Sequence, residues 1–172
     1  MIKNKLTKSE IRAKIKELLE QIAVLQEMLN NIKSNRERLY DAAIAAIGTD
    51  ASPNDLAPDE LGCAETVNAI FESVFGKQIG GALSTHNMYL ALKDDKRFIK
   101  VDQAMPGDII ISPTGYGNGG LSNGHVGIFK DSETIMSNSS ATGTWEVNYT
   151  LKKWVARYRN KGGYPIFFFR VI

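Results

Sequence analysis

Residues 123–129 read NGHVGIF, with a histidine at the start of an apolar run that follows a glycine-rich loop. The run has the β-branched and aromatic composition of a strand. Three further runs of this kind lie at residues 108–112, 134–137 and 164–171. Apolar residues at helical spacing predict helices at residues 63–75, 85–92 and 151–159. Helices first, then a meander of strands, predict an α+β fold with an antiparallel sheet.

Cys63 is the single cysteine of the chain, and it follows Gly62 at the start of the predicted helix 63–75. A helix N-terminus points the positive end of the helix dipole at the sulfur and favours the thiolate, which is the nucleophilic form. Most free cysteines are instead small buried hydrophobic residues, and that role does not need a helix terminus. We therefore predict that Cys63 is a nucleophile.

A thiol nucleophile needs a base within reach, and the chain has two histidines. His86 falls in the first turn of the predicted helix 85–92, and we interpret it as solvated. His125 stands where a strand begins, so it can point off the sheet edge towards a helix end. The alternative is a strand-end histidine whose hydrogen bonds are satisfied locally. We predict that His125 is the base.

Three motifs in this order resemble the papain-like CHAP and NlpC-type peptidoglycan peptidases: Cys63 at a helix start, MPGDIII at residues 105–111 and GHVGI at residues 124–128. In that superfamily a helix presents the cysteine, a PGD motif opens the first core strand, and GHVGI carries the histidine on the next. The resemblance covers about residues 49–172. It implies a papain-like (CHAP/NlpC-type) domain, and an amidase or endopeptidase that cuts the stem peptide or cross-bridge of peptidoglycan.

The resemblance also implies a third residue that orients the imidazole from the strand after the histidine strand. We choose Asn138, because a side-chain amide oxygen can hold the imidazole N–H. Ser137 or Ser139 takes its place if the register shifts by one. The sequence lacks the second histidine of the NlpC-type group and the glutamate of many CHAP members.

These residues predict a thioester mechanism. His125 takes the thiol proton, the thiolate attacks the scissile carbonyl, and the thioester is hydrolysed. The backbone N–H of Cys63 is the expected first donor to the oxyanion. Transfer of the acyl group to another acceptor would use the same residues.

Two residues are predicted to contact the substrate. Tyr116 lies in the glycine-rich loop 113–120, which we interpret as a wall of the substrate groove. Glu65 follows the cysteine closely enough to touch a cationic substrate group, with a solvated helix carboxylate as the alternative. Trp145 and Trp154 are predicted to be buried in the core.

Before residue 48 the sequence is one long helical pattern, which opens with a capping signature at Thr7–Glu10. Apolar residues then alternate at spacings of four and three: Ile11, Ile15, Leu18, Ile22, Leu25, Leu29 and Ile32. This heptad seam predicts a coiled-coil-like arm over residues 1–47. The arm either forms a homo-oligomer or packs on its own domain, and residues 48–172 form the peptidase domain.

Composition argues against several classes of protein and site. The net charge is +2, without the basic block of a dedicated nucleic-acid binder. The sequence has no run of roughly 20 apolar residues to span a membrane, and residues 1–6 lack the apolar core of a signal peptide. One cysteine and two distant histidines cannot form a structural zinc site. The acids Asp50, Asp55, Asp59 and Glu60 lack the spacing of a calcium loop.

We therefore predict no metal or cofactor, and no nucleic-acid or membrane partner. The predicted partner is bacterial peptidoglycan. The small size, the arm and the missing signal peptide indicate a phage endolysin, made in the host cytoplasm and acting on the cell wall. The competing hypothesis is a non-catalytic wall-binding or structural module assembled by the N-terminal coil.

Overall fold

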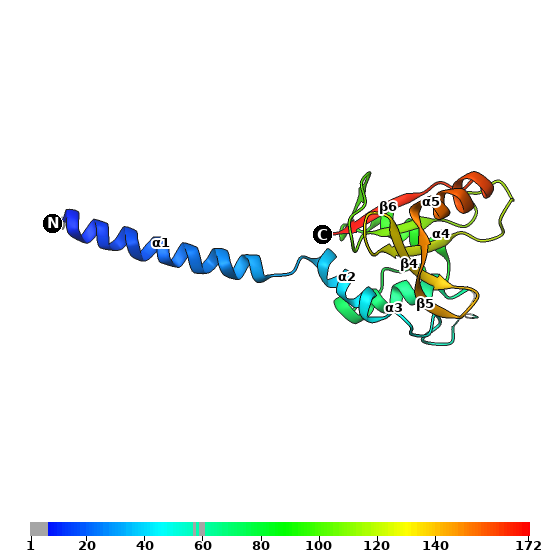
Figure 1. Cartoon of the computed structure of the whole chain (residues 1–172), viewed down its shortest axis with the longest axis horizontal. Helices are drawn as coiled ribbons and strands as arrows, with labels where there is room; N and C mark the ends of the chain where they lie inside the picture. The colour runs from blue at the N-terminus through cyan, green and yellow to red at the C-terminus, as the bar shows by residue number, and fades with distance from the viewer. Residues whose placement is uncertain (1–6, 57, 59–60) are drawn as a thin grey trace. The chain divides into compact units, whose positions relative to one another are not determined.

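The computed structural model describes residues 7–56, 58 and 61–172, without the side chains of residues 29–31. It divides into two compact units, Met1–Lys33 and Ser34–Ile172 (Figure 1). The predictions made for residues 1–6, for Asp59 and Glu60, and for the side chain of Leu29 lie outside the described part. Among the described residues, none of the helices combines the length and apolarity that crossing a membrane requires.

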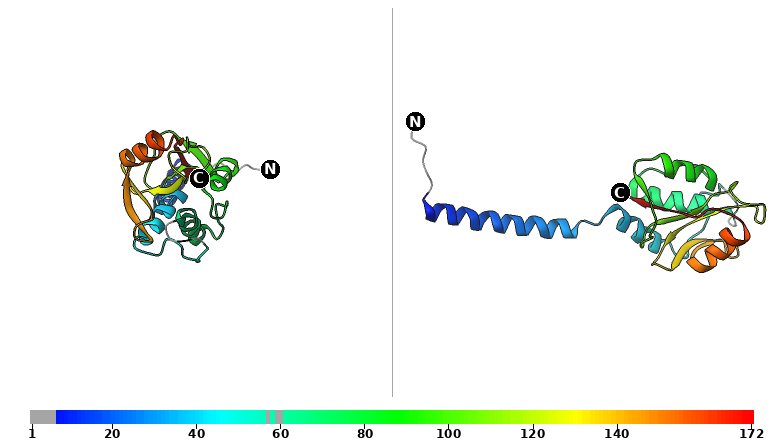
Figure 2. Two further views of the ribbon diagram at one scale, coloured as in Figure 1. Left: turned by 90° about the vertical axis from the view of Figure 1, so that its right-hand side faces the viewer. Right: turned by 90° about the horizontal axis from the view of Figure 1, so that it is seen from above.

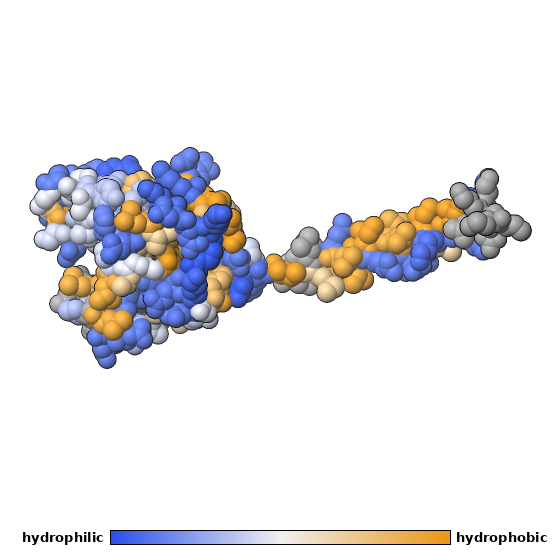
Figure 3. All heavy atoms as spheres, turned by 180° about the vertical axis from the view of Figure 1, so that it is seen from behind, coloured by the Kyte–Doolittle hydropathy of each residue, from blue (hydrophilic) through white to orange (hydrophobic). Residues whose placement is uncertain are grey.

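The first unit is the helix α1 (Lys8–Asn31), which begins at the predicted capping box. The N–H of Thr7 donates to Glu10 Oε2 at 2.7 Å, and the N–H of Glu10 donates to Thr7 Oγ1 at 3.3 Å. Apolar side chains gather along one side of the helix (Figure 3). Among them, Ile15 and Ile22 are 51% and 50% exposed. A coiled coil buries such a seam against a partner helix, and self-association of the arm stays a prediction.

The helix α2 (Asn35–Ala45) belongs to the second unit. Ser34 and Glu37 form a second capping box, with the Ser34 N–H donating to Glu37 Oε2 at 2.8 Å. This cap starts a new helix, so the long helical pattern predicted up to residue 47 is broken. Leu39 and Ala43 are fully buried in the core of the second unit. The second compact unit therefore begins at Ser34, and the division into an arm (1–47) and a peptidase domain (48–172) stays a prediction.

In the described residues, six strands form one sheet in the order β1-β6-β2-β3-β4-β5, and every neighbouring pair is antiparallel. The strands are β1 (Phe98–Val101), β2 (Ile109–Ser112), β3 (His125–Phe129), β4 (Thr134–Ser139), β5 (Thr144–Thr150) and β6 (Phe167–Val171). The predicted α+β class with an antiparallel sheet is confirmed. The two edge strands, β1 and β5, were not predicted, because only one residue in each is buried and neither shows an apolar run.

Helices cover both faces of the sheet. They are α3 (Cys63–Phe75), α4 (Thr85–Asp94), α5 (Leu151–Trp154) and the π-helix η2 (Val155–Lys161). Ile109 and Ile111 pack in one core with α2, α3 and α4, whereas Ile110 packs in a second core with Trp154 and Tyr158. Figure 2 accordingly shows α5 and η2 (orange) on the opposite side of this unit from α4 (green). Strand alternation thus sends neighbouring isoleucines to different cores.

We predict that the α1 seam brings two chains together as a parallel coiled coil. The double substitution Ile15→Glu with Ile22→Glu places like charges at facing seam positions and should convert a dimer into a monomer. Sedimentation equilibrium of the full chain measures this change. Ala13→Glu with Ala23→Glu adds the same charge off the seam and should leave the dimer intact. A wild-type mass that stays monomeric at every concentration would contradict the prediction.

Candidate active site

Cys63 is the first residue of α3, where the sequence predicts it. A Cβ at Gly62 would lie 2.2 Å from the carbonyl oxygen of Ala51, so only glycine lets that loop pack against the helix start. Thr66 Oγ1 donates to the Gly62 carbonyl at 3.0 Å and also hydrogen-bonds the Ala51 carbonyl. These contacts hold the first turn of α3 in place. The Cys63 side chain is 7% exposed, and it lines a cavity.

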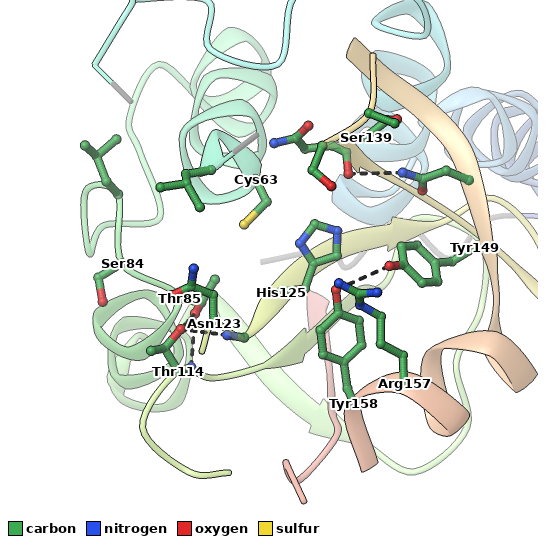
Figure 4. Close-up of a pocket in the computed structure, with 17 residues that line it drawn as sticks. Cys63, Ser84, Thr85, Thr114, Asn123, His125, Ser139, Tyr149, Arg157 and Tyr158 are labelled. Atoms are coloured by element: carbon green, nitrogen blue, oxygen red, sulfur yellow. Dashed lines mark hydrogen bonds between the residues drawn. The ribbon is translucent and has the colours of Figure 1, made fainter. Parts of the chain in front are cut away.

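His125 is the first residue of β3 and pairs with Ser112 at the end of the sheet. A Cβ at Gly124 would lie 2.0 Å from the Ser112 carbonyl oxygen, and the Gly124 N–H donates to Thr114 Oγ1 at 2.8 Å. The backbone before His125 is therefore held against the neighbouring strand. Figure 4 shows the Cys63 thiol pointing towards the His125 ring across the cavity.

The cavity has a volume of about 680 Å³ and opens where α3, α4, η2 and the ends of β3, β4 and β5 meet. Cys63 comes from the start of α3, which covers one face of the sheet, and His125 comes from the start of β3, at the end of the sheet. Polar and aromatic groups line most of the remaining wall. They include Thr85, Thr114, Asn123, Asn138, Ser139, Asn148, Tyr149, Arg157 and Tyr158.

Three aromatic rings surround the His125 imidazole. Its centroid is 5.2 Å from that of Trp154, 5.6 Å from Tyr158 and 5.8 Å from Tyr149. Trp154 is fully buried, as predicted, and its Nε1 donates to Ser112 Oγ at 3.0 Å. The rings therefore restrict the orientation of the imidazole and remove part of its contact with water.

A hydrogen-bond chain behind His125 runs in one direction. Asn148 Nδ2 donates to the Asn138 carbonyl at 3.0 Å, which turns Asn148 Oδ1 towards Ser137. Ser137 Oγ donates its single proton to that oxygen at 2.6 Å. In the 3.0 Å contact between His125 Nε2 and Ser137 Oγ the ring must then be the donor. Nε2 carries the proton, and Nδ1 is left as the base.

A β-bulge makes this chain possible. Ile135 pairs with Tyr149 and Met136 pairs with Val147, so Asn148 is an extra residue in β5. Consecutive residues of a regular strand point to opposite faces. Here Asn148 and Tyr149 both line the cavity, because the bulge turns the strand between them.

The side chain that contacts the His125 ring is Ser137, one of the alternatives left open, and not Asn138. Gly127 pairs with Ser137, so strand alternation puts Ser137 on the same face of the sheet as His125. Asn138 falls on the other face, which is the face covered by α3. It still lines the cavity, as Ser139 does, and contributes its carbonyl to the chain.

The structure does not bring Glu65 to the cavity. Its carboxylate accepts hydrogen bonds from Ser52 Oγ at 2.7 Å and from the Asn54 N–H at 2.8 Å. The residue is 3% exposed and ties the preceding loop to α3. The carboxylate is thus used within the fold, and the substrate contact of Glu65 stays a prediction.

Tyr116 is not among the described residues that line the cavity. Its ring stacks on His86 at 5.5 Å and meets the edge of Tyr89 at 5.6 Å. His86, predicted to be solvated, is thus a half-buried partner of this tyrosine. Loop 113–120 contacts α4 through Thr114 and Tyr116, and Thr114 lines the cavity. The substrate contact of Tyr116 stays a prediction.

Among the cavity residues that were not predicted from the sequence are Asn148, Tyr149, Arg157 and Tyr158. The first two depend on a bulge and the last two on a π-helix, which are interruptions of the regular patterns that sequence analysis searches for. The helix predicted at residues 151–159 is observed as α5 followed by η2. The described residues hold no group of three or more His, Cys, Asp or Glu arranged to bind a metal ion.

Burial sets the protonation of both reacting groups. It raises the pKa of the Cys63 thiol to about 11, while hydrogen bonds from the backbone of Val126, Ala64 and Cys63 act in the opposite direction. Burial also lowers the pKa of His125 to about 3, the positive charge of Arg157 adds to this effect, and the backbone of Asn138 opposes it. At neutral pH the pair is therefore a thiol and a neutral imidazole, and not the thiolate expected from the helix terminus.

We predict that the rate of Cys63 alkylation by iodoacetamide rises with pH with an apparent pKa of about 11, and not with the ordinary thiol pKa of 9.0. At pH 8 the thiolate fraction is then about a hundredfold below that of a free cysteine. A rate profile by mass spectrometry measures this pKa. A plateau below pH 7 that disappears in His125→Ala would show an ion pair and contradict the prediction.

Removing the proton acceptor of Ser137 should disturb the His125 tautomer. In Asn148→Ala the Ser137 hydroxyl is released to donate to Nε2, which favours the tautomer with the proton on Nδ1. Imidazole ¹⁵N chemical shifts distinguish the two forms. Ser139→Ala, a neighbouring serine that also lines the cavity, should leave the wild-type tautomer unchanged. If the wild type already carries the proton on Nδ1, the donor and acceptor roles assigned to His125, Ser137 and Asn148 are wrong.

No family model and no curated protein sequence matches the chain. Among solved structures, its fold is similar to a chain of the type VI effector–immunity complex Tae3–Tai3 from Ralstonia pickettii. The match covers 81% of this chain and 100% of that chain, at a TM-score of 0.51 and 17% sequence identity. At this identity the similarity shows a shared fold.

Proposed function

We propose that the unit Ser34–Ile172 is a papain-like cysteine peptidase of the CHAP/NlpC type that cuts amide bonds of peptidoglycan. The observation that carries the proposal is the meeting of Cys63 and His125 in one cavity, with Nδ1 left as the free base. The two residues come from a helix start and a strand start, the elements that the resemblance assigns to them. The fold is similar to that of a chain of the effector–immunity complex Tae3–Tai3.

The mechanism starts from a neutral pair. As the Cys63 sulfur attacks the scissile carbonyl, its proton passes to His125 Nδ1, so the thiolate does not exist as a resting state. The imidazolium then gives this proton to the leaving amine, and a thioester remains. Water, deprotonated by the same nitrogen, hydrolyses the thioester and restores the thiol. Throughout, the Nε2 proton stays on the ring, because Ser137 Oγ accepts its hydrogen bond.

Other groups supply orientation and charge stabilisation. The backbone N–H of Cys63, at the start of α3, is the proposed donor to the oxyanion. Ser137 and Asn148 replace the carboxylate or amide that orients the histidine in other triads. Because both acceptors are neutral, they fix the tautomer but contribute less stabilisation to an imidazolium than a carboxylate would.

The cellular role that we propose is that of a phage endolysin, made in the host cytoplasm and acting on the bacterial cell wall. The arm α1 would join two such enzymes or hold one on a partner. The competing function, a non-catalytic module that binds the wall, uses the same arm but needs no base beside Cys63. The hydrogen bonds of Ser137 leave His125 Nδ1 unprotonated beside Cys63, and this tautomer favours the enzyme over the binding module.

We predict that the wild-type protein releases peptide fragments from purified peptidoglycan and that Cys63→Ala releases none, because the thioester cannot form. Mass spectrometry of the fragments identifies the new amine and carboxyl termini and so names the cleaved bond. His125→Ala should be as inactive as Cys63→Ala, whereas His86→Ala, outside the cavity, should retain activity. Absence of fragments on walls of several chemotypes would favour the binding module.

A further inference from the structure

Arg157 brings a permanent positive charge to the cavity. Of the described residues that line the cavity, it is the one Lys, Arg, Asp or Glu. It forms no ion pair with any carboxylate in the described part of the chain. The residue is exposed, so its charge is accessible from solvent, and it lowers the pKa of the neighbouring His125.

Two tyrosine hydroxyls lie beside this charge. The Arg157 guanidinium carbon is 5.6 Å from the ring centroid of Tyr158, and the Tyr158 hydroxyl is 3.4 Å from that of Tyr149. Figure 4 shows the guanidinium beside both phenol groups, on the same side of the cavity as His125. The π-helix η2 rotates successive residues through a smaller angle than an α-helix, which lets Arg157 and Tyr158 both face the cavity.

This set of donors matches a carboxylate. A guanidinium presents paired N–H groups in one plane, which fit the two oxygens of a carboxylate. One of the two phenols donates to the other, and the second phenol supplies a further O–H donor. An ammonium or a neutral amide would gain much less from the same groups. Peptidoglycan stem peptides carry free carboxylates beside their amide bonds, and in some walls these groups are carboxamides.

We propose that Arg157, with the hydroxyls of Tyr149 and Tyr158, forms a subsite for a carboxylate of the substrate, next to the scissile amide. This assignment rests on the proposed peptidase function and adds its substrate class. The enzyme would act on stem peptides in which that group is a free acid and discriminate against amidated ones.

Binding at this subsite also changes the base. The charge of Arg157 is one of the causes that keep the pKa of His125 low. A bound carboxylate neutralises that charge and so favours proton transfer from Cys63 to His125. The substrate thus completes the electrostatic environment that its own cleavage needs.

Two stem peptides that differ only in this carboxylate, one as the free acid and one as the carboxamide, test the proposal. For the wild type we expect kcat/KM to be about tenfold to a hundredfold higher on the acid, from the loss of a charged hydrogen bond. Arg157→Gln should lose activity on the acid alone, which brings the ratio of kcat/KM on the acid to kcat/KM on the carboxamide near one. Arg159→Gln, on the same helix but outside the cavity lining, should keep the wild-type ratio.

Equal losses on both peptides in Arg157→Gln, or a wild type without preference, would overturn the subsite. A binding experiment separates this failure from failure of the proposed function. Calorimetry of the inactive Cys63→Ala protein should show tighter binding of the acid, and Cys63→Ala with Arg157→Gln should show none of this preference. Binding that depends on Arg157, without turnover by the wild type, would support the subsite and reject the peptidase. Turnover by the wild type, without binding that depends on Arg157, would support the peptidase and reject the subsite.

Discussion

A serine hydroxyl has one proton, and the chemistry proposed for this protein depends on where the proton of Ser137 points. It points to Asn148 Oδ1, because the Asn148 amide is already held by the Asn138 carbonyl. Ser137 can therefore only accept from His125 Nε2, and the free lone pair of the ring is on Nδ1. The bulge in β5 is what delivers Asn148 to this position. One irregular residue in an edge strand thus decides which nitrogen can act as a base.

The resting protonation of the site follows from a comparison of magnitudes. A helix terminus stabilises an adjacent thiolate by about 0.3–1 kcal/mol in ordinary cases. Burial moves the pKa of Cys63 from 9.0 to about 11, which corresponds to about 3 kcal/mol. Desolvation therefore wins over the dipole. The advantage of a preformed thiolate is lost, and the proton must move during attack on the substrate.

The two reacting residues could be located from the sequence because both lie at the start of a regular helix or strand pattern. The helical spacing after Cys63 and the apolar run after His125 are local signals, and Gly62 and Gly124 occupy positions where the structure has no room for a side chain. The order of the elements gave the α+β class in the same way. The break between α1 and α2 could not be predicted from the apolar spacing, because that spacing resumes after the cap at Ser34.

Residues whose role depends on irregular backbone could not be placed in this way. A one-residue difference in register exchanges Asn138 for Ser137, and only the pairing with Gly127 decides between them. Glu65 follows Cys63 closely in sequence, but its carboxylate is used by Ser52 and Asn54, loop groups whose approach depends on tertiary structure. Arg157 was overlooked because a π-helix does not repeat at the spacing of an α-helix.

The groups around His125 differ in whether a substrate can change them. The rings of Trp154, Tyr149 and Tyr158 are fixed by packing, so the desolvation that they cause is the same with and without substrate. The charge of Arg157 is exposed to the cavity and can be cancelled by a carboxylate. That cancellation has its greatest effect when His125 becomes positively charged, which happens only as the Cys63 proton is transferred. An interaction that strengthens in the transition state accelerates the chemical step as well as binding. Discrimination between acidic and amidated substrates is therefore expected in kcat as well as in KM.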